Sequence, residues 1–505
     1  AGSNEAYAGG GGDLEHDNDL AGSPRVYEYI LGGRTVDMGA YEYQGDPDIG
    51  IRYVKPADGG GASDGDGRYW ASASSDLQAM IDELAEAGGG EVWVAKGKYI
   101  APGADAEGGF VMKNNVAVYG GFTGGETLRN DRDWEANETI LSGNNVTRVI
   151  NNSYTEADTL AASAILDGFT VTHGRITSFN DGAGIYNVYA SPTLTNLIIT
   201  DNINEGYDAK TGGGVFNDHS SPTLNRVRIT GNRAGITGGM ANVASSPVLN
   251  DVVITGNAGA GLAPVGGMSV SGESNPLLRN VVISGNYGIG MSVLSGASPT
   301  LINVVITGNT SWGMSAGRSG VVSLYNVTVS GNLGGVQTTK SSEPFIHNTI
   351  IWGNGENNYI GNDIFPDGAS GNNLIEGMDG HNTVDGEVYT GTAADLFADY
   401  QPATAEAATA AGNYQLTACS PAINAGDDAG YPGGMDSLTV QLDATGGSRH
   451  AWGTVDIGAF EYQEVPTPRI VAVPVDSVYK AGDSLHFTVD FFRTIYVSGE
   501  PSIPL

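Results

Sequence analysis

The chain has few cations, one cysteine and no long apolar segment, and each shortage excludes a class of protein. Its 505 residues include 23 Lys and Arg against 57 Asp and Glu, which gives a net charge of −34. Nucleic-acid binders and proteins that coat anionic membranes rely on clustered Lys and Arg, so this composition excludes both. Cys419 is the single cysteine, which excludes a disulfide within the chain, and no histidine near it in the sequence offers a partner for a catalytic thiol. No apolar run approaches the roughly 18 residues of a membrane-spanning helix.

Glycine is abundant instead, at 77 residues, and hydrophobic residues make up 40% of the chain. Average glycine usage is about 7%. Twice that amount without a three-residue period excludes collagen and indicates many tight turns. The apolar share is enough for a large core, so wholesale disorder is excluded as well.

A nine-residue phrase recurs seven times between residues 194 and 354, with insertions only between the copies. One copy is Leu-Asn-Asp-Val-Val-Ile-Thr-Gly-Asn at 249–257, and every copy ends in Asn, 22 to 30 residues after the preceding one. A Ser-Pro corner or a close equivalent separates this phrase from a Gly-aliphatic phrase. Each unit is therefore predicted to be two short strands joined by a proline corner and a Gly-Asn turn. Units of this length suit one coil of a parallel β-solenoid, in which coils stack about 4.8 Å apart.

Stacked coils in register predict columns of like side chains. Five of the closing asparagines are expected to form an amide ladder at one corner: Asn232, Asn257, Asn286, Asn309 and Asn332. Four methionines are expected to fill an inward row of the core: Met240, Met268, Met291 and Met314. An outward stripe lies between the inward-facing residues and is either a docking face or a flat surface beneath a loop: Ile198, Arg228, Val253, Val282, Val305 and Thr328. Beside it runs a second outward row: Asn196, Arg226, Asp251, Asn280, Asn303 and Asn326.

Residues 75–87 form the best helix candidate in the chain. Ser75 is the expected N-cap, with Gln78 at the capping-box position. An exposed solenoid end is an open sheet edge, so this helix is expected to cover the N-terminal mouth. Its apolar face is Leu77, Met80, Ile81 and Leu84.

Three sets of motifs carry a resemblance to known families. The segments Gly88-Gly-Gly-Glu-Val-Trp-Val-Ala-Lys-Gly-Lys-Tyr99 and Tyr119-Gly-Gly-Phe-Thr-Gly-Gly-Glu126 are similar to the entry of bacterial right-handed parallel β-helix proteins of the pectate-lyase-like superfamily. The coils resemble polymorphic outer-membrane-protein repeats. The segment Cys419-Ser-Pro-Ala-Ile-Asn-Ala-Gly426 with Val455-Asp-Ile-Gly-Ala-Phe-Glu-Tyr462 resembles the closing element of "choice-of-anchor Q" surface proteins. The resemblance covers roughly residues 50–463 and implies an adhesin-like, secreted protein of the bacterial cell surface.

The closing motif occurs twice, which predicts the domain organisation. Val36-Asp-Met-Gly-Ala-Tyr-Glu-Tyr-Gln44 matches Val455-Asp-Ile-Gly-Ala-Phe-Glu-Tyr-Gln463. Residues 1–44 are therefore predicted to be the C-terminal tail of a preceding β-helix unit, and residues 45–463 an all-β, right-handed parallel β-helix domain with the N-terminal capping helix. Residues 464–505 are predicted to be a linker and the first strands of an incomplete immunoglobulin-like sandwich, either truncated or completed by another chain.

β-Helix folds include polysaccharide lyases and hydrolases, so acidic clusters are candidates for chemistry. One cluster on two adjacent coils is either a catalytic or calcium site or a set of solvated turn carboxylates: Asp181, Asp201, Asp208, Asp218 and His219. Two glycine-rich acidic loops have the oxygen-rich character of a calcium loop, and structural Ca²⁺ is the only cofactor expected: Asp58, Asp64 and Asp66, and Asp13, Asp17 and Asp19.

Three functions remain open from the sequence. The leading prediction is a non-enzymatic module of a large secreted bacterial adhesin or filament, which acts as a rigid spacer and binds a glycan or a cell surface. The first alternative is a polysaccharide lyase or hydrolase that uses the region of Asp181 and Asp218. The second is a subunit of an extracellular filament that assembles through residues 464–505. The expected partners are neighbouring domains or copies of the same polypeptide and a glycan or cell-surface ligand, with no nucleic acid.

Overall fold

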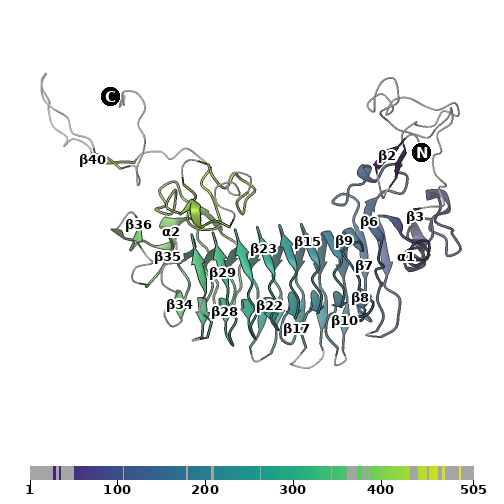
Figure 1. Cartoon of the computed structure of the whole chain (residues 1–505), viewed down its shortest axis with the longest axis horizontal. Helices are drawn as coiled ribbons and strands as arrows, with labels where there is room; N and C mark the ends of the chain where they lie inside the picture. Colours follow the sequence, from purple (N-terminus) through teal and green to yellow (C-terminus); the bar gives the residue numbers. More distant parts are fainter. Residues whose placement is uncertain are drawn as a thin grey trace, which may run out of the picture.

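The computed structural model describes residues 50–432 and 442–463, apart from 106, 178–179, 206–209, 262, 340, 343, 361–371, 379–382, 385–386 and 452–453, together with strands at 27–29, 33–35, 469–472 and 488–490. The chain winds into a rod of stacked coils, and the coils follow one another along the long axis in sequence order (Figure 1). The helices in the described part of the chain are all too short or too polar to cross a membrane.

From β8 onward, the coils contribute strands to a nine-stranded sheet in which all neighbours are parallel, with a register shift between β22 and β25. Its strands are β8 (Ile150–Ser153), β11 (Ile185–Val188), β14 (Val215–Asp218), β18 (Met240–Val243), β22 (Val265–Ser271), β25 (Ile289–Val293), β28 (Trp312–Ala316), β31 (Gly334–Thr338) and β34 (Tyr359–Ile360). A four-stranded sheet covers a corner of the coils: β10 (Arg175–Ile176), β13 (Ile203–Asn204), β17 (Arg233–Ala234) and β21 (Ala258–Gly259).

The remaining strands of the rod belong to a second, longer parallel sheet, here called the long sheet. Its first strands are β3 (Ile51–Val54), β4 (Gly90–Ala95), β5 (Gly97–Ile100), β6 (Val116–Phe122), β7 (Thr139–Ser142), β9 (Ile165–Thr172) and β12 (Thr193–Thr200). Two strands per coil follow: β15 (Thr223–Asn225) and β16 (Arg228–Thr230), β19 (Val248–Asn250) and β20 (Val253–Thr255), β23 (Leu277–Arg279) and β24 (Val282–Ser284), β26 (Thr300–Ile302) and β27 (Val305–Thr307), β29 (Ser323–Tyr325) and β30 (Thr328–Ser330), and β32 (Phe345–His347) and β33 (Ile350–Ile351), before β35 (Leu374–Ile375).

The long sheet bends at one residue in every coil, because that residue adopts a left-handed backbone conformation. The residue is Asn in most coils, and Asn and Asp tolerate this conformation better than other side chains with a Cβ atom. Arg226 adopts it as well, at φ 52°. We call this line of residues the kink row: Asn196, Arg226, Asp251, Asn280, Asn303 and Asn326. It coincides with the second outward row of the sequence.

The predicted asparagine ladder is confirmed and is longer than expected. The Nδ2 atom of Asn257 donates to Oδ1 of Asn286 at 3.1 Å and to the carbonyl of Ile229 at 2.9 Å. The same pattern repeats from Asn202 to Asn354. Because these amides are buried, they satisfy backbone groups at a corner that water does not reach.

The core of the rod consists of the columns of inward-facing side chains that the repeat predicts. The four column methionines are fully buried, as is the aliphatic row Leu224, Leu249, Leu278, Leu301 and Leu324. At the N-terminal end, helix α1 (Leu77–Glu86) buries its predicted apolar face against β3, β4 and β6. The N-cap is Asp76 rather than Ser75, since the Asp76 side chain accepts from the backbone N–H of Ala79. Gln78 instead bonds to the backbone of Val111.

The all-β parallel β-helix with its capping helix is therefore confirmed. Outside the rod, the structure describes an antiparallel pair β1 (Tyr27–Tyr29) and β2 (Gly33–Thr35) and another, β40 (Arg469–Ala472) and β41 (Thr488–Asp490). The single pair β40 and β41 does not confirm the immunoglobulin-like start. The assignment of residues 1–44 and 464–505 stays a prediction.

Candidate functional site

A groove lies on the outer face of the long sheet. It has a volume of about 430 Å³ and lies beside the kink row, where a loop rises over the sheet. The loop follows β6 and returns to the sheet at β7. The groove is lined by Trp134, Glu135, Glu138, Thr139, Gly168, Phe169, Thr170, Asn196, Leu197, Ile198, Arg226 and Arg228.

The N-terminal wall of the groove is held against the sheet by a glycine and an ion pair. Gly168 adopts φ +86°, and a Cβ atom there would lie 2.7 Å from Nη1 of Arg132 and 3.0 Å from Cβ of Trp134. Only glycine allows this close approach without strain. Nη2 of Arg132 pairs with the Asp167 carboxylate at 2.8 Å, and both side chains are largely buried. Trp134 is thereby fixed at the edge of the groove.

A chain of hydrogen bonds runs from this wall along the kink row. Nδ2 of Asn196 donates to Oδ1 of Asp167 at 2.7 Å. Nε of Arg226 donates to Oδ1 of Asn196 at 2.8 Å. Farther along the same row, Asn280 donates to Asp251 at 3.1 Å. The row therefore holds the Arg226 side chain in one orientation on the groove floor.

Two arginines on the groove floor carry unneutralised charge. Arg226 and Arg228 are exposed, and neither forms an ion pair with a residue that the structure describes. Arg228 lies in register with Ile198 and Val253 on its two neighbouring strands, so apolar side chains flank it. The chain as a whole has a net charge of −34, so two neighbouring arginines without an ion-pair partner form a locally positive site. Such a pair attracts an anionic ligand.

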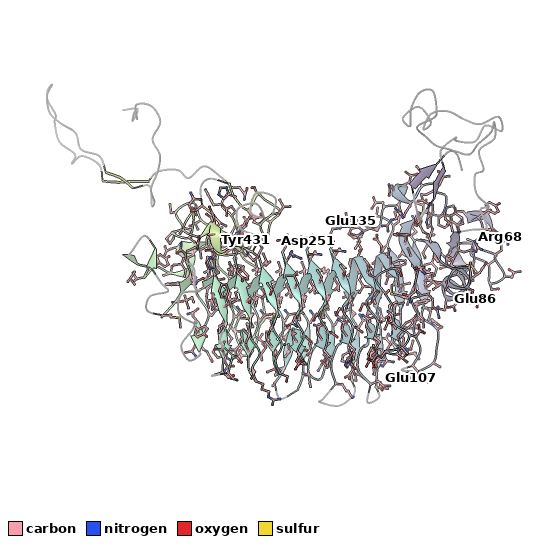
Figure 2. The ribbon with its side chains drawn as sticks, viewed as in Figure 1. Arg68, Glu86, Glu107, Glu135, Asp251 and Tyr431 are labelled. Atoms are coloured by element: carbon pink, nitrogen blue, oxygen red, sulfur yellow. The ribbon has the colours of Figure 1, made fainter. Side chains whose placement is uncertain are left out.

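Two carboxylates, those of Glu135 and Glu138, line the same groove as the arginines. Oε1 of Glu138 accepts a hydrogen bond from Oγ1 of Thr170 at 3.0 Å, and its other oxygen has no hydrogen-bond partner among the described residues. Glu135 is exposed at the rim (Figure 2). The groove thus combines cations, a positioned carboxylate and the aromatic ring of Trp134.

The C-terminal end of the outer face is covered by the segment that follows the coils. Asn303 of the kink row donates to the carbonyl of Leu442 at 2.8 Å and to the hydroxyl of Tyr431 at 3.3 Å. Asn326 donates to the carbonyl of Asp456, and the backbone N–H of Ala459 donates to Thr328. Figure 2 shows Tyr431 beyond Asp251 at this end of the face.

The covering segment divides the predicted outward stripe into a part that it covers and a part that reaches solvent. All six residues of the stripe point outward as predicted, because their neighbours in the same strands are core residues. However, Val305 is 3% exposed and Thr328 is fully buried, since the C-terminal segment packs over them. In the rest of the stripe, Ile198 and Arg228 are exposed and Val253 and Val282 are half-buried.

The structure brings only part of the predicted acidic cluster together. Asp218 pairs with His219 at 2.7 Å, and its charge acts on Asp181. Burial is the main effect that raises the pKa of Asp181, whose Oδ1 accepts from the backbone N–H of Thr211. Asp201 lies at the end of β12, at another corner of the coil, where it bonds to Thr200. Asp208 lies outside the described residues.

The structure describes no calcium site at the predicted loops. Asp66 accepts from Ser72 and from the backbone of Arg68, which satisfies its carboxylate within its own loop. Within the described residues, no three His, Cys, Asp or Glu side chains gather closely enough to hold a metal, and this includes Asp58 and Asp64. Asp13, Asp17 and Asp19 lie outside the described residues. Structural calcium stays a prediction.

The sequence analysis missed the carboxylate and aromatic side of the groove. Trp134, Glu135 and Glu138 lie in a loop outside the repeat, so no column pointed to them. A signal was available in Arg226 and Arg228, two cations on one coil of an otherwise acidic chain.

Comparisons with known proteins agree with the fold. A family model described as "Right handed beta helix region" matches residues 265–391, which agrees with the predicted handedness. Pectate lyase Pel9A is 14% identical with a TM-score of 0.42, over 81% of this chain and 96% of that one. The A-module of the Azotobacter vinelandii mannuronan C-5 epimerase AlgE4 is 17% identical with a TM-score of 0.39, over 62% of this chain and 92% of that one. No curated protein matches the chain.

These comparisons correct the prediction that the chain is not an enzyme, because the β-helix structures similar to it are a lyase and an epimerase. They give no support to the adhesin and outer-membrane parts of the resemblance. Identities of 14% and 17% concern the fold alone, so the chemistry of this chain depends on its own groove residues. By fold, the chain is a right-handed parallel β-helix.

Proposed function

We propose that this chain is an enzyme that cleaves an acidic, uronate-containing polysaccharide by β-elimination in the groove beside the kink row. The observation that carries the proposal is the pair Arg226 and Arg228, which lack an ion-pair partner among the described residues and line one groove with Glu138 and Trp134. A polyanion is repelled by the acidic chain as a whole, so binding requires cations at the point of contact.

The groove residues supply the parts that the reaction needs. Arg226 and Arg228 bind the carboxylate of a uronate, and their charge makes the hydrogen on the adjacent C5 more acidic. Glu138 accepts that proton. The electron pair left on C5 forms the C4–C5 double bond, and the glycosidic oxygen leaves C4 and takes a proton from water. Thr170 orients the Glu138 carboxylate through its hydrogen bond.

The test is turnover of polygalacturonate and polymannuronate, followed by the ultraviolet absorbance of the conjugated C4–C5 double bond. The Glu138→Gln variant is expected to lose activity by at least about a hundredfold, which is the usual contribution of a positioned general base. Arg228→Ala is expected to raise KM about tenfold, because one charged hydrogen-bonding group is lost. Arg233→Ala removes an exposed arginine that does not line the groove and serves as the matched control.

Two outcomes contradict the proposal. If no polyuronate is turned over, the proposed function is wrong. If Arg228→Ala and Arg233→Ala lose activity equally, the groove is not the site of the reaction. A product with inverted C5 and no double bond, detected by NMR, replaces elimination by epimerisation, since both reactions begin with the same proton transfer.

The extracellular, bacterial cell-surface location belongs to the same proposal, because a polymeric substrate of this kind is met outside the cell. Protease treatment of intact cells tests it: degradation of the protein without lysis is expected, and full protection contradicts it.

A further inference from the structure

The exposed floor of the groove has a wall at each end along the axis of the rod. At the N-terminal end, Trp134 and Glu135 rise over the coil that precedes Asn196. At the C-terminal end, Tyr431 and Leu442 bond to Asn303 and close the kink row. Figure 2 shows Asp251 between Glu135 and Tyr431 along the long axis.

Burial of the central outward row gives the length of the open floor. Thr170 is 8% exposed on one side of it, and Val305 is 3% exposed on the other. Between them lie four coils whose central residues reach solvent: Ile198, Arg228, Val253 and Val282. At about 4.8 Å per coil, the open floor is roughly 4 × 4.8 ≈ 19 Å long.

The side chains of this floor form rows that run along the axis. Parallel strands in register place equivalent residues one above another, so each row offers one residue per coil. Beside the central row run the kink row and a row of hydroxyl residues, of which Thr200 and Thr230 are half-buried, whereas Thr255 and Ser284 are buried. A sugar residue advances a linear polysaccharide by about the length of one coil, so a chain that lies along the axis meets one residue of the central row per sugar.

We infer, on the basis of the proposed function, that the groove accepts the end of a chain or a short oligosaccharide of about four sugars, rather than the interior of a long polymer. A longer chain that lies along the rows runs into Trp134 at one end or Tyr431 at the other. The terminal sugar stacks its apolar face on the half-buried ring of Trp134, and the arginines bind the carboxylates of the first residues.

The test is calorimetric binding of uronate oligosaccharides of increasing length to the full chain with Glu138→Gln, which prevents turnover. Affinity is expected to rise up to about four sugars and then to stay constant. Trp134→Ala is expected to weaken binding of the tetramer about tenfold, which corresponds to loss of one buried aromatic contact. Ile100→Ala shortens an exposed apolar side chain away from the groove and is the control.

A second measurement follows the wild-type protein on long polyuronate and compares viscosity with the number of bonds cut. Release of short products with little loss of viscosity is expected. Affinity that keeps rising well beyond four sugars, or a rapid fall of viscosity after few cuts, overturns the inference while the proposed function stands. Absence of binding at every length overturns both.

Discussion

Asn196 accepts a hydrogen bond at 2.8 Å from Nε of Arg226 and donates one at 2.7 Å to the carboxylate of Asp167. A carboxylate only accepts and a guanidinium only donates, so these two partners fix which end of the amide faces which neighbour. Asp167 is itself paired with Arg132. The wall of the groove and the cation on its floor are therefore parts of one network.

Replacement of Asn196 by Gly is expected to release Arg226 without straining the backbone, because Asn196 has φ 50° and glycine adopts that conformation freely. KM for polyuronate is expected to rise about fivefold, the factor for a hydrogen bond of ~1 kcal/mol, with kcat little changed. Steady-state kinetics measure both. Asn145→Gly, at φ 58° and away from the groove, is the control and should leave KM unchanged. An equal rise of KM in both variants would show that Asn196 does not position Arg226.

Replacement of Asn257 by Ala is expected to destabilise the rod strongly. The change removes the amide bonds to Asn286 and Ile229 and leaves the backbone N–H of Asn232 without its acceptor. Loss of buried hydrogen bonds of this kind costs about 2–4 kcal/mol. Chemical denaturation followed by circular dichroism measures it. Asn250→Ala removes one partly exposed hydrogen bond to Asn225 and should cost less than half as much. Similar costs for both variants would show that the buried ladder does not stabilise the rod more than an exposed amide pair does.

Replacement of Gly168 by Ala is expected to push the N-terminal wall away from the sheet. The new methyl group would meet Arg132 and Trp134, and the positive φ adds strain. We expect a loss of about 1–3 kcal/mol of stability and a lower activity on polyuronate. Gly125, in the loop that carries Trp134, has nothing within 4 Å of its would-be Cβ, so Gly125→Ala should change neither quantity. Full activity of Gly168→Ala would show that activity does not depend on the position of the N-terminal wall.

The covering C-terminal segment is expected to weaken as the pH rises. Burial and, next in size, the charge of Asp456 raise the pKa of Glu461 to about 8, against an ordinary value of 4.5, while Arg449 opposes the shift. The folded protein therefore keeps a proton that the unfolded chain loses between these two values. The contribution of Glu461 to the free energy of unfolding is therefore largest below pH 4.5. It falls by up to about 1.4 kcal/mol per pH unit until about pH 8.

Glu461→Gln is expected to flatten this dependence, because the amide carries no charge at any pH. Urea denaturation at several pH values, from about 5 to about 8.5, measures the slope for both proteins. Identical slopes would show that Glu461 is not the titrating group.

The sequence by itself determined the coil, its columns and its stack of parallel strands. Side-chain alternation in a strand and repeat-to-repeat register are local properties, so Asn257, Met268 and Val282 could be assigned to ladder, core and outer face without coordinates. The capping helix could likewise be predicted from the local sequence, although the choice of Asp76 over Ser75 as its N-cap depended on backbone geometry.

Only the tertiary structure decided where the groove is and which residues line it. Glu138 and Trp134 belong to a non-repeating loop that lines the same groove as Arg226, which lies about ninety residues later in the chain, and no period encodes that proximity. The cover over Val305 and Thr328 comes from a segment more than a hundred residues beyond them. The repeat determines which residues occupy equivalent positions in successive coils. The groove, in contrast, forms where non-repeating segments fold back over the sheet and make some coils different from the rest.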